Sequence, residues 1–222
     1  MKSLFNESFS LMQKLGKSLM VPVSVLPAAG LLVALGRILE DLATTDQVVT
    51  STTLLVVGKL FYSGGLAIFE QLPLIFAIGV AIGFTGGAGV AALAAAVGYF
   101  TLTNILKVIG EVRELTLAIN TGVFGGIIIG LITAYIYKRF FKTQLPKVLG
   151  FFSGKRLVPI LAAVAAVFTG IILGLIWPPV QEAIHSFGSN IMSSEFGPAF
   201  YAAGKRLLIP VGLHHVYYPP FL

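Results

Sequence analysis

Four long stretches without an acidic or basic residue constrain this chain more than any other feature of its sequence. They cover residues 18–36, 71–106, 115–137 and 157–181. Only 11% of the 222 residues are charged, whereas an ordinary soluble domain has about 25%. A membrane-spanning helix needs roughly 20 mostly apolar residues, and lipid makes each charged side chain costly. The stretches therefore predict helices that span a membrane.

The second stretch is too long for one helix. Its centre holds Thr85-Gly86-Gly87-Ala88-Gly89, and clustered glycines break a helix locally. We expect two helices joined by a tight turn there, which gives five predicted spans by about residue 181. The fold class is thus predicted to be an all-α integral membrane protein.

Residues 196–222 are apolar again but interrupted, which predicts a sixth membrane segment that is irregular or re-entrant. The interrupting residues are Gly204, Lys205, Arg206, Pro210 and Gly212.

Basic residues concentrate in two places. Three precede the first span, and six lie between residues 138 and 156 with no acid among them. Cytoplasmic loops of membrane proteins carry such an excess of Lys and Arg. Because four predicted spans separate the two regions, both lie on the same side, and we predict that this side is the cytoplasm. Residues 37–59 and 107–114 then lie on the opposite side. The net charge of +6 needs no nucleic-acid partner, and none is predicted.

Two proline pairs predict irregularities in the spans. Pro22 and Pro27 predict a kink in the first span, which could be static or a hinge, because proline frees backbone carbonyls that a neighbour must satisfy. Trp177-Pro178-Pro179 predicts the end of the fifth span, since tryptophan anchors at the membrane interface and prolines stop a helix. In the fourth span, glycines at positions 122, 126 and 130 predict close helix packing.

Polar chemistry in the apolar part of the sequence concentrates in residues 205–220. This segment holds Lys205, Arg206, His214 and His215, together with two tyrosines and three prolines. Ionisable residues at membrane depth indicate a functional site, and transporters form substrate sites from broken membrane segments. The structural alternative is a reverse turn at the membrane surface with solvated histidines. The chain has no cysteine and no soluble-enzyme motif, so no catalytic residue, metal or cofactor is predicted.

Several strings together resemble a known family, in order along the chain. They are residues 16–27 (GKSLMVPVSVLP), 72–83 (LPLIFAIGVAIG), 121–126 (TGVFGG), 145–146 (LP), 149–159 (LGFFSGKRLVP), 177–179 (WPP) and 208–215 (LIPVGLHH). They look like the sugar permeases of the bacterial phosphotransferase system, the EIIC membrane components of the glucose, N-acetylglucosamine and maltose type. The resemblance covers essentially the whole chain.

The resemblance implies a function and an organisation. Such permeases sit in the bacterial inner membrane, bind a hexose and present it for phosphorylation by a phosphocysteine on a partner domain, EIIB, here on a separate chain. By that pattern Arg206 and His214 would contact the sugar, with Lys205 and His215 as neighbours. The pattern also implies a homodimer, an interface domain (18–181), and a linker with the start of a transport domain (182–222). Residues 1–17 mix apolar and polar side chains, which predicts either a short amphipathic helix on the cytoplasmic face or a helical extension of the first span.

The chain also departs from the family pattern. Family members have about ten spans, and the later Gly-Ile-Thr-Glu-Pro-type motif that contacts the sugar is absent here, as is the EIIB cysteine. We therefore expect a truncated or split permease that works only with a complementary chain. Glucose is the first expected sugar, with N-acetylglucosamine or maltose as alternatives. A dimerising membrane remnant without transport is the competing hypothesis.

Overall fold

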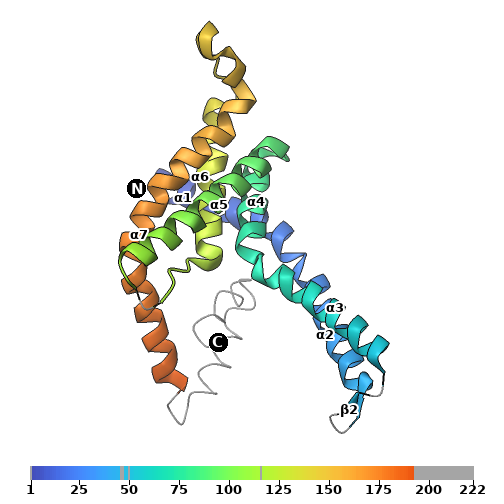
Figure 1. The fold of residues 1–222 in the computed structure, drawn as a ribbon. Coiled ribbons are helices and arrows are strands. Elements are labelled where there is room, and N and C mark those ends of the chain that lie inside the picture. Colours follow the sequence, from blue (N-terminus) through green and yellow to red (C-terminus); the bar gives the residue numbers. More distant parts are fainter. Residues whose placement is uncertain (1, 46–47, 50, 116, 193–222) are drawn as a thin grey trace. The chain divides into compact units, whose positions relative to one another are not determined.

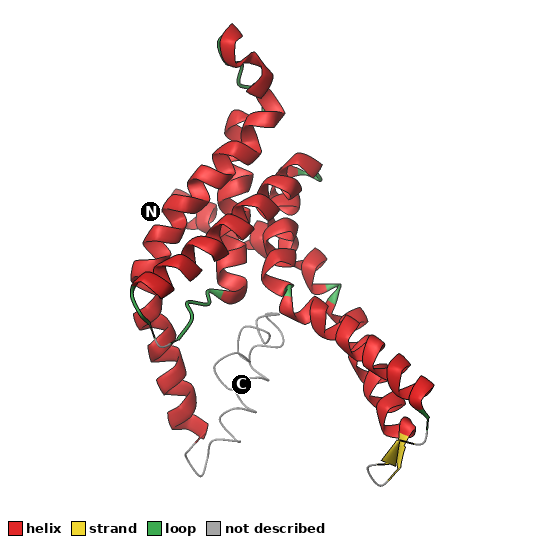
Figure 2. Ribbon diagram, viewed as in Figure 1, coloured by secondary structure: helices red, strands yellow, loops and turns green. Residues whose placement is uncertain are grey.

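A computed structural model describes residues 2–45, 48–49, 51–115 and 117–192, which are almost entirely helical (Figures 1 and 2). The helices are α1 (Lys2–Val23), α2 (Leu26–Ala43), α3 (Thr52–Glu70), α4 (Leu72–Thr85), α5 (Gly89–Val112), α6 (Gly122–Phe140) and α7 (Leu157–Met192), with the short 3₁₀ helices η1 (Lys147–Phe152) and η2 (Gly154–Arg156). Strands β1 (Thr44–Thr45) and β2 (Val48–Val49) form one antiparallel pair. The chain divides into unit 1, Met1–Phe100 with Gly122–Ala166, and unit 2, whose described part is residues 101–121 and 167–192.

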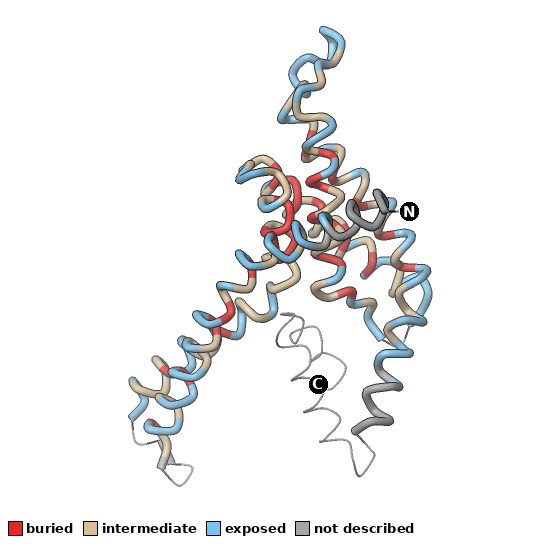
Figure 3. The backbone as a smooth tube through the Cα atoms, turned by 180° about the vertical axis from the view of Figure 1, so that it is seen from behind, coloured by how far each residue is buried: buried red, intermediate tan, exposed pale blue. Residues whose placement is uncertain are grey.

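Five helical stretches are long and apolar enough to cross a membrane. They are Gln13–Ala43, Thr52–Glu70, Gly89–Val112, Gly122–Phe140 and Gly154–Ile184. Many of their large apolar residues are exposed (Figure 3), as expected where lipid replaces water as the solvent. The all-helical membrane fold class predicted from the sequence is confirmed.

These five stretches differ in part from the five spans that the sequence predicted. Helix α3 contains Lys59 and ends at Glu70, so it lies outside the uncharged stretches. The prediction that residues 37–59 lie between spans is therefore wrong, because residues 37–43 belong to α2 and residues 52–59 to α3. Helix α4, predicted as a full span, has only 14 residues. The two helices meet at Gln71, because Pro73 falls in the first turn of α4 and starts a new helix there. Only Gln71 separates the two helices, and of the two only α3 is long enough to count as a candidate span by itself.

The kink predicted from Pro22 and Pro27 is present between α1 and α2. Helix α1 ends at Val23, and α2 begins at Leu26 with Pro27 in its first turn. The intervening turn is closed by the Ser24 amide, which donates to the Met20 carbonyl at 3.0 Å, and by the Val25 amide, which donates to the Pro22 carbonyl at 3.3 Å. Pro22 itself is buried, where it packs against Gly79 of α4.

Helices α2 and α3 form an antiparallel hairpin closed by the β1–β2 pair (Figure 1). Their backbones touch at glycines: a Cβ added to Gly65 would lie 2.7 Å from the Ala29 carbonyl oxygen and 2.8 Å from the Val33 amide nitrogen. Near the middle of the hairpin, an Arg37 guanidinium nitrogen donates to the Tyr62 hydroxyl at 3.2 Å, and the guanidinium carbon lies 4.5 Å from the centre of the Tyr62 ring. Small residues thus set the spacing of the hairpin, as they do in helix pairs in lipid.

Helix α6 packs on α4 through two of the three glycines that the sequence singled out. A Cβ on Gly126 would collide with the Pro73 carbonyl oxygen, and one on Gly130 would lie 2.7 Å from the Ala77 carbonyl oxygen. Gly122 differs, because it has a φ of +50° and open space around it. It starts α6, so the predicted packing face holds for positions 126 and 130 alone.

The glycine cluster between α4 and α5 makes the predicted tight turn. Gly86 and Gly87 have φ angles of +68° and +92°, a region that side chains disfavour, and the Gly87 amide donates to the Ile82 carbonyl at 3.1 Å. The turn returns α5 against the bundle, where Ala94 is fully buried with Ile136, Val158 and Ala162. This core joins α5, α6 and the first part of α7 within unit 1.

Candidate functional site

The sequence-predicted site residues Lys205, Arg206, His214 and His215 lie outside the described residues, as does the predicted sixth membrane segment. Two other groups of polar or charged side chains are described. One lies in unit 2, where residues 113–121 meet the proline pair of α7. The other is the basic loop, residues 138–156 of unit 1.

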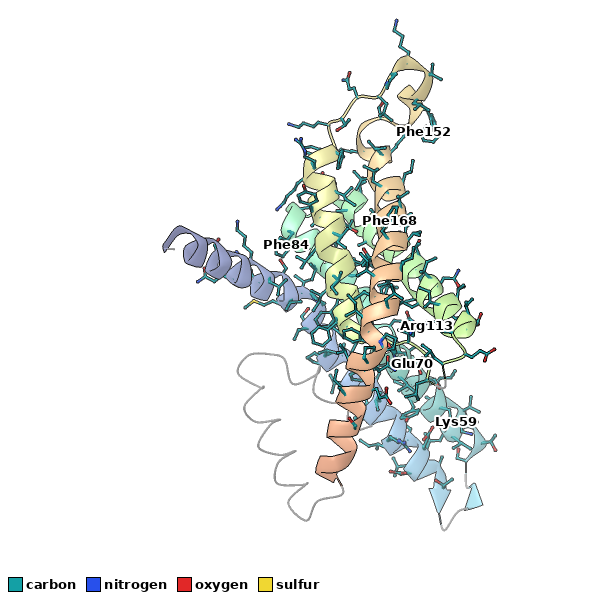
Figure 4. The ribbon with its side chains drawn as sticks, turned by 90° about the vertical axis from the view of Figure 1, so that its left-hand side faces the viewer. Lys59, Glu70, Phe84, Arg113, Phe152 and Phe168 are labelled. Carbon is teal, nitrogen blue, oxygen red and sulfur yellow. The ribbon has the colours of Figure 1, made fainter. Side chains whose placement is uncertain are left out.

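Helix α7 does not stop at the proline pair, which corrects the prediction that Trp177-Pro178-Pro179 ends the fifth span. It continues through both prolines to Met192. Proline lacks the amide hydrogen that would donate to the carbonyl four residues earlier, so Pro178 leaves the carbonyl of the buried Gly174 without its usual partner. A guanidinium nitrogen of Arg113 donates to that carbonyl oxygen at 3.0 Å (Figure 4). A charged side chain from another element thereby replaces the missing backbone hydrogen bond.

Packing between α5 and α7 brings Arg113 to this carbonyl. Gly174 has no side chain, and Ile109 fills the space: a Cβ added to Gly174 would lie 2.6 Å from the Ile109 Cδ1 atom. Arg113 follows Ile109 by four residues, so both side chains point to the same face. The segment after α5 also turns sharply, since Glu114 has a φ of +49°.

The segment after this turn is fastened to α7 by side-chain hydrogen bonds. The Gln181 side chain accepts from the Asn120 amide and donates to the Ala118 carbonyl, each at 3.0 Å. The Trp177 indole donates to the Asn120 carbonyl at 2.8 Å. Trp177 was predicted as an interface anchor, and the described contact is a specific hydrogen bond to a loop.

A pocket of about 100 Å³ lies beside these contacts, lined by Leu115, Leu117, Ile119, Pro178, Gln181 and Glu182. Small-molecule sites usually enclose about 300–1,000 Å³. The pocket is too small to be assigned a sugar, and we interpret the whole arrangement as structural. It holds the connection between α5 and α6 against a helix that carries two prolines.

The basic loop is an ordered structure. The Gly154 amide donates to the Thr143 carbonyl at 2.8 Å, and the Leu145 amide donates to the Ser153 hydroxyl oxygen at 2.9 Å. These two bonds close the neck of the loop, with η1 at its tip, where Phe152 lies beyond the ends of α6 and α7 (Figure 4).

Cations of the loop lie over aromatic rings. Arg156 lies 4.5 Å from the centre of the Phe151 ring, and the Lys142 ammonium lies 5.2 Å from that of Phe141. The Lys138 ammonium lies 5.5 Å from the ring of Phe84 in α4. Such pairs combine a positive charge with an apolar body.

Comparison with known proteins decides the family. The family model "Phosphotransferase system, EIIC" matches residues 16–222, nearly the whole chain. The chain belongs to the EIIC family of the phosphotransferase system. A curated relative, the "PTS system glucosamine-specific EIICBA component" of Bacillus subtilis (strain 168), is 47% identical over 225 residues. That match covers 98% of this chain and 33% of the relative, so the chain spans about a third of its length.

As an EIIC protein, this chain is a multi-pass membrane protein, which agrees with its five long apolar helices. Among the described residues, no group of three His, Asp or Glu side chains could hold a metal ion. Sequence reasoning found the basic loop through its charges but missed the role of Arg113. The available signal was Pro178 four residues after Gly174, which identifies a carbonyl in need of a donor but not the donor itself.

Proposed function

We propose that this chain is the membrane component of a phosphoenolpyruvate-dependent sugar phosphotransferase system. It would take up a hexose while an EIIB phosphocysteine domain phosphorylates it. The observation that carries the proposal is the EIIC match over residues 16–222, on a chain with five helices able to cross a membrane. The protein carries the substrate, and the covalent chemistry belongs to its partner.

The relative's name bears on which hexose to test. It is called glucosamine-specific and shares 47% of its aligned residues with this chain. Glucosamine and glucose differ only at one ring substituent, so we propose them as the first two substrates. N-acetylglucosamine and maltose, which the sequence resemblance also suggested, follow them.

We further propose that Arg206 and His214 contact the sugar, with Lys205 and His215 beside them. The support is the occurrence of ionisable residues in an otherwise apolar segment, which is costly in lipid unless a function requires it. Arginine and histidine also donate hydrogen bonds to hydroxyl oxygens. No catalytic role is proposed for these residues.

The orientation proposal places the N-terminus and the basic loop in the cytoplasm of a bacterium, at its inner membrane. Six cations and no acid occupy residues 138–156, in keeping with the positive-inside rule. If α3 and α4 count as one bent path, four passes separate the N-terminus from this loop. The number of passes between the N-terminus and the basic loop is then even, as predicted, although the passes are made by partly different helices. The three proposed regions remain 1–17, 18–181 and 182–222, with 18–181 forming a homodimer interface.

The test is sugar phosphorylation in inside-out membrane vesicles from a host without its own glucose and glucosamine permeases. The vesicles carry this chain, alone or with a second chain that supplies the remaining two thirds of the glucosamine-specific relative. Phosphoenolpyruvate, the general phosphotransferase proteins, an EIIB domain and radiolabelled sugar are added. We expect sugar phosphate in at least one arrangement, and less of it with His214→Ala.

Absence of sugar phosphate in both arrangements, with the chain present in the membrane, would reject the proposal. If cross-linking then still gave dimers, the chain would be the non-transporting membrane scaffold that was the competing hypothesis. Binding of radiolabelled sugar to the purified chain would exclude that scaffold.

A further inference from the structure

The tip of the basic loop exposes apolar side chains that the protein's core does not use. Val148 is 93% exposed and Phe151 is 70% exposed, and Leu149 and Phe152 beside them are also exposed. Since apolar surface in water costs roughly 25 cal/mol per Å², an ordered segment of this composition favours an apolar surrounding. The loop follows α6 and precedes α7 directly, and both helices are able to cross a membrane. A bilayer surface is therefore the apolar environment within reach.

The same loop carries cations that lack acidic partners within the described part of the chain. Lys142, Lys147, Lys155 and Arg156 have no acid near them in sequence, because none occurs between residues 115 and 181. Arg156 also donates to the Phe151 carbonyl at 3.2 Å, which keeps its charge beside the exposed ring. Charge and apolar surface thus occur together on one small ordered element.

We propose that residues 141–156 dock on the bilayer surface, with the tip residues at the level of the headgroups, and bind anionic phospholipid headgroups in preference to neutral ones. Each cation near an anionic membrane contributes about a fivefold preference, reduced by salt. An acidic protein surface would satisfy the cations, but it would not account for the exposed valine, leucine and phenylalanines next to membrane helices. Lipid accounts for both. The proposal depends on the chain being in a membrane and is independent of which sugar it carries.

The absence of cysteine from the chain provides a clean probe. In the full chain, Val148→Cys introduces one thiol at a side chain that is almost fully exposed, and the thiol is labelled with an environment-sensitive fluorophore. The protein is reconstituted in vesicles that contain either spin-labelled phosphatidylglycerol or spin-labelled phosphatidylcholine at the same mole fraction. The measurement is the ratio of fluorescence quenching by the two lipids.

We expect quenching by phosphatidylglycerol to exceed that by phosphatidylcholine about two- to fivefold, since salt and competing lipid reduce the full effect. Lys147→Gln with Lys155→Gln should bring the ratio close to one. The matched control, Lys59→Gln with Lys107→Gln, removes two lysines outside the loop and should leave the ratio unchanged. High salt should lower the ratio in the unsubstituted loop, which tests the proposal even if the double variant fails to fold.

Equal quenching by both lipids would overturn the proposal, as would a ratio that survives both high salt and the loop substitutions. If phosphatidylglycerol did not quench the label preferentially but an added EIIB domain changed its fluorescence, the loop would be a protein-docking surface. That result would also overturn the proposal. Because the readout involves no sugar, failure here is distinguishable from failure of the proposed transport function.

Discussion

The hydrogen bond from Arg113 to the Gly174 carbonyl predicts an energetic coupling between Arg113 and Pro178. Arg113→Met keeps most of the side chain's length but removes the donor, which leaves the carbonyl that Pro178 has freed without a partner. A hydrogen bond to a charged group contributes about 1.5–3 kcal/mol. We take about 1.5 kcal/mol, the low end of that range, because Arg113 keeps exposed surface. For a chain of this size, that loss corresponds to a decrease in Tm of about 3–6 °C.

The reasoning is tested by a double-mutant cycle with Pro178→Ala. Alanine restores the amide hydrogen four residues after Gly174, so the helix can satisfy its own carbonyl. Arg113→Met should then cost about 0.5 kcal/mol or less, a coupling energy of about 1 kcal/mol. Independent sites add within about 0.3–0.5 kcal/mol, so a coupling of this size is measurable.

The assay is thermal unfolding of the four proteins, purified in the same detergent and followed by the fluorescence of Trp177, the single tryptophan. Lys107→Met, which removes an exposed cation six residues earlier, in α5, is the control and should change Tm little. Equal destabilisation by Arg113→Met in the proline and alanine backgrounds would refute the claim that Arg113 replaces the missing amide.

Three further predictions follow from individual contacts. Gly65→Ala should lower Tm by several degrees relative to Gly64→Ala. The added methyl group meets the α2 backbone at position 65 and open space at position 64, and overpacking costs about 1–3 kcal/mol. Equal Tm values for the two variants would mean that the α2–α3 contact is wrongly placed. Gln181→Ala removes two hydrogen bonds to residues 118–120, each worth about 0.5–1.5 kcal/mol. The substitution should therefore speed limited trypsin cleavage after Arg113, whereas Glu182→Ala should not. Unchanged cleavage in the Gln181→Ala variant would show that Gln181 does not hold this segment. His214→Ala should reduce sugar phosphorylation in the vesicle assay without changing the amount of protein in the membrane, and full activity would remove His214 from the proposed sugar contacts.

The membrane class, the turn at Gly86-Gly87 and the packing of Gly126 and Gly130 could be predicted from the sequence because each depends on local composition. Uncharged windows follow from the cost of charge in lipid, the turn from the tendency of clustered glycines to break a helix, and the packing from the spacing of small residues. The limits of the helices could not be predicted in the same way. Lys59 made the α3 segment look too polar for a span, and the proline pair predicted an end that α7 does not have. In both cases, tertiary contacts allow a helix to contain a charge or a proline.

Two arginines in apolar parts of the chain, Arg37 and Arg113, show how tertiary contacts stabilise a charge there. Arg37 is held by the hydroxyl and ring of Tyr62, and Arg113 by a carbonyl that a proline has freed. Both contacts join residues far apart in the sequence, so no local pattern reveals them. A charge in an apolar stretch therefore has two distinct explanations, a structural partner within the fold or a ligand. The distinction is experimental: a structural arginine is detected by its coupling to the group it holds, as in the cycle with Pro178, whereas a ligand-binding one changes sugar turnover and leaves Tm in place. For Arg206, the same two measurements distinguish a sugar contact from a structural hydrogen bond of the kind that Arg113 makes.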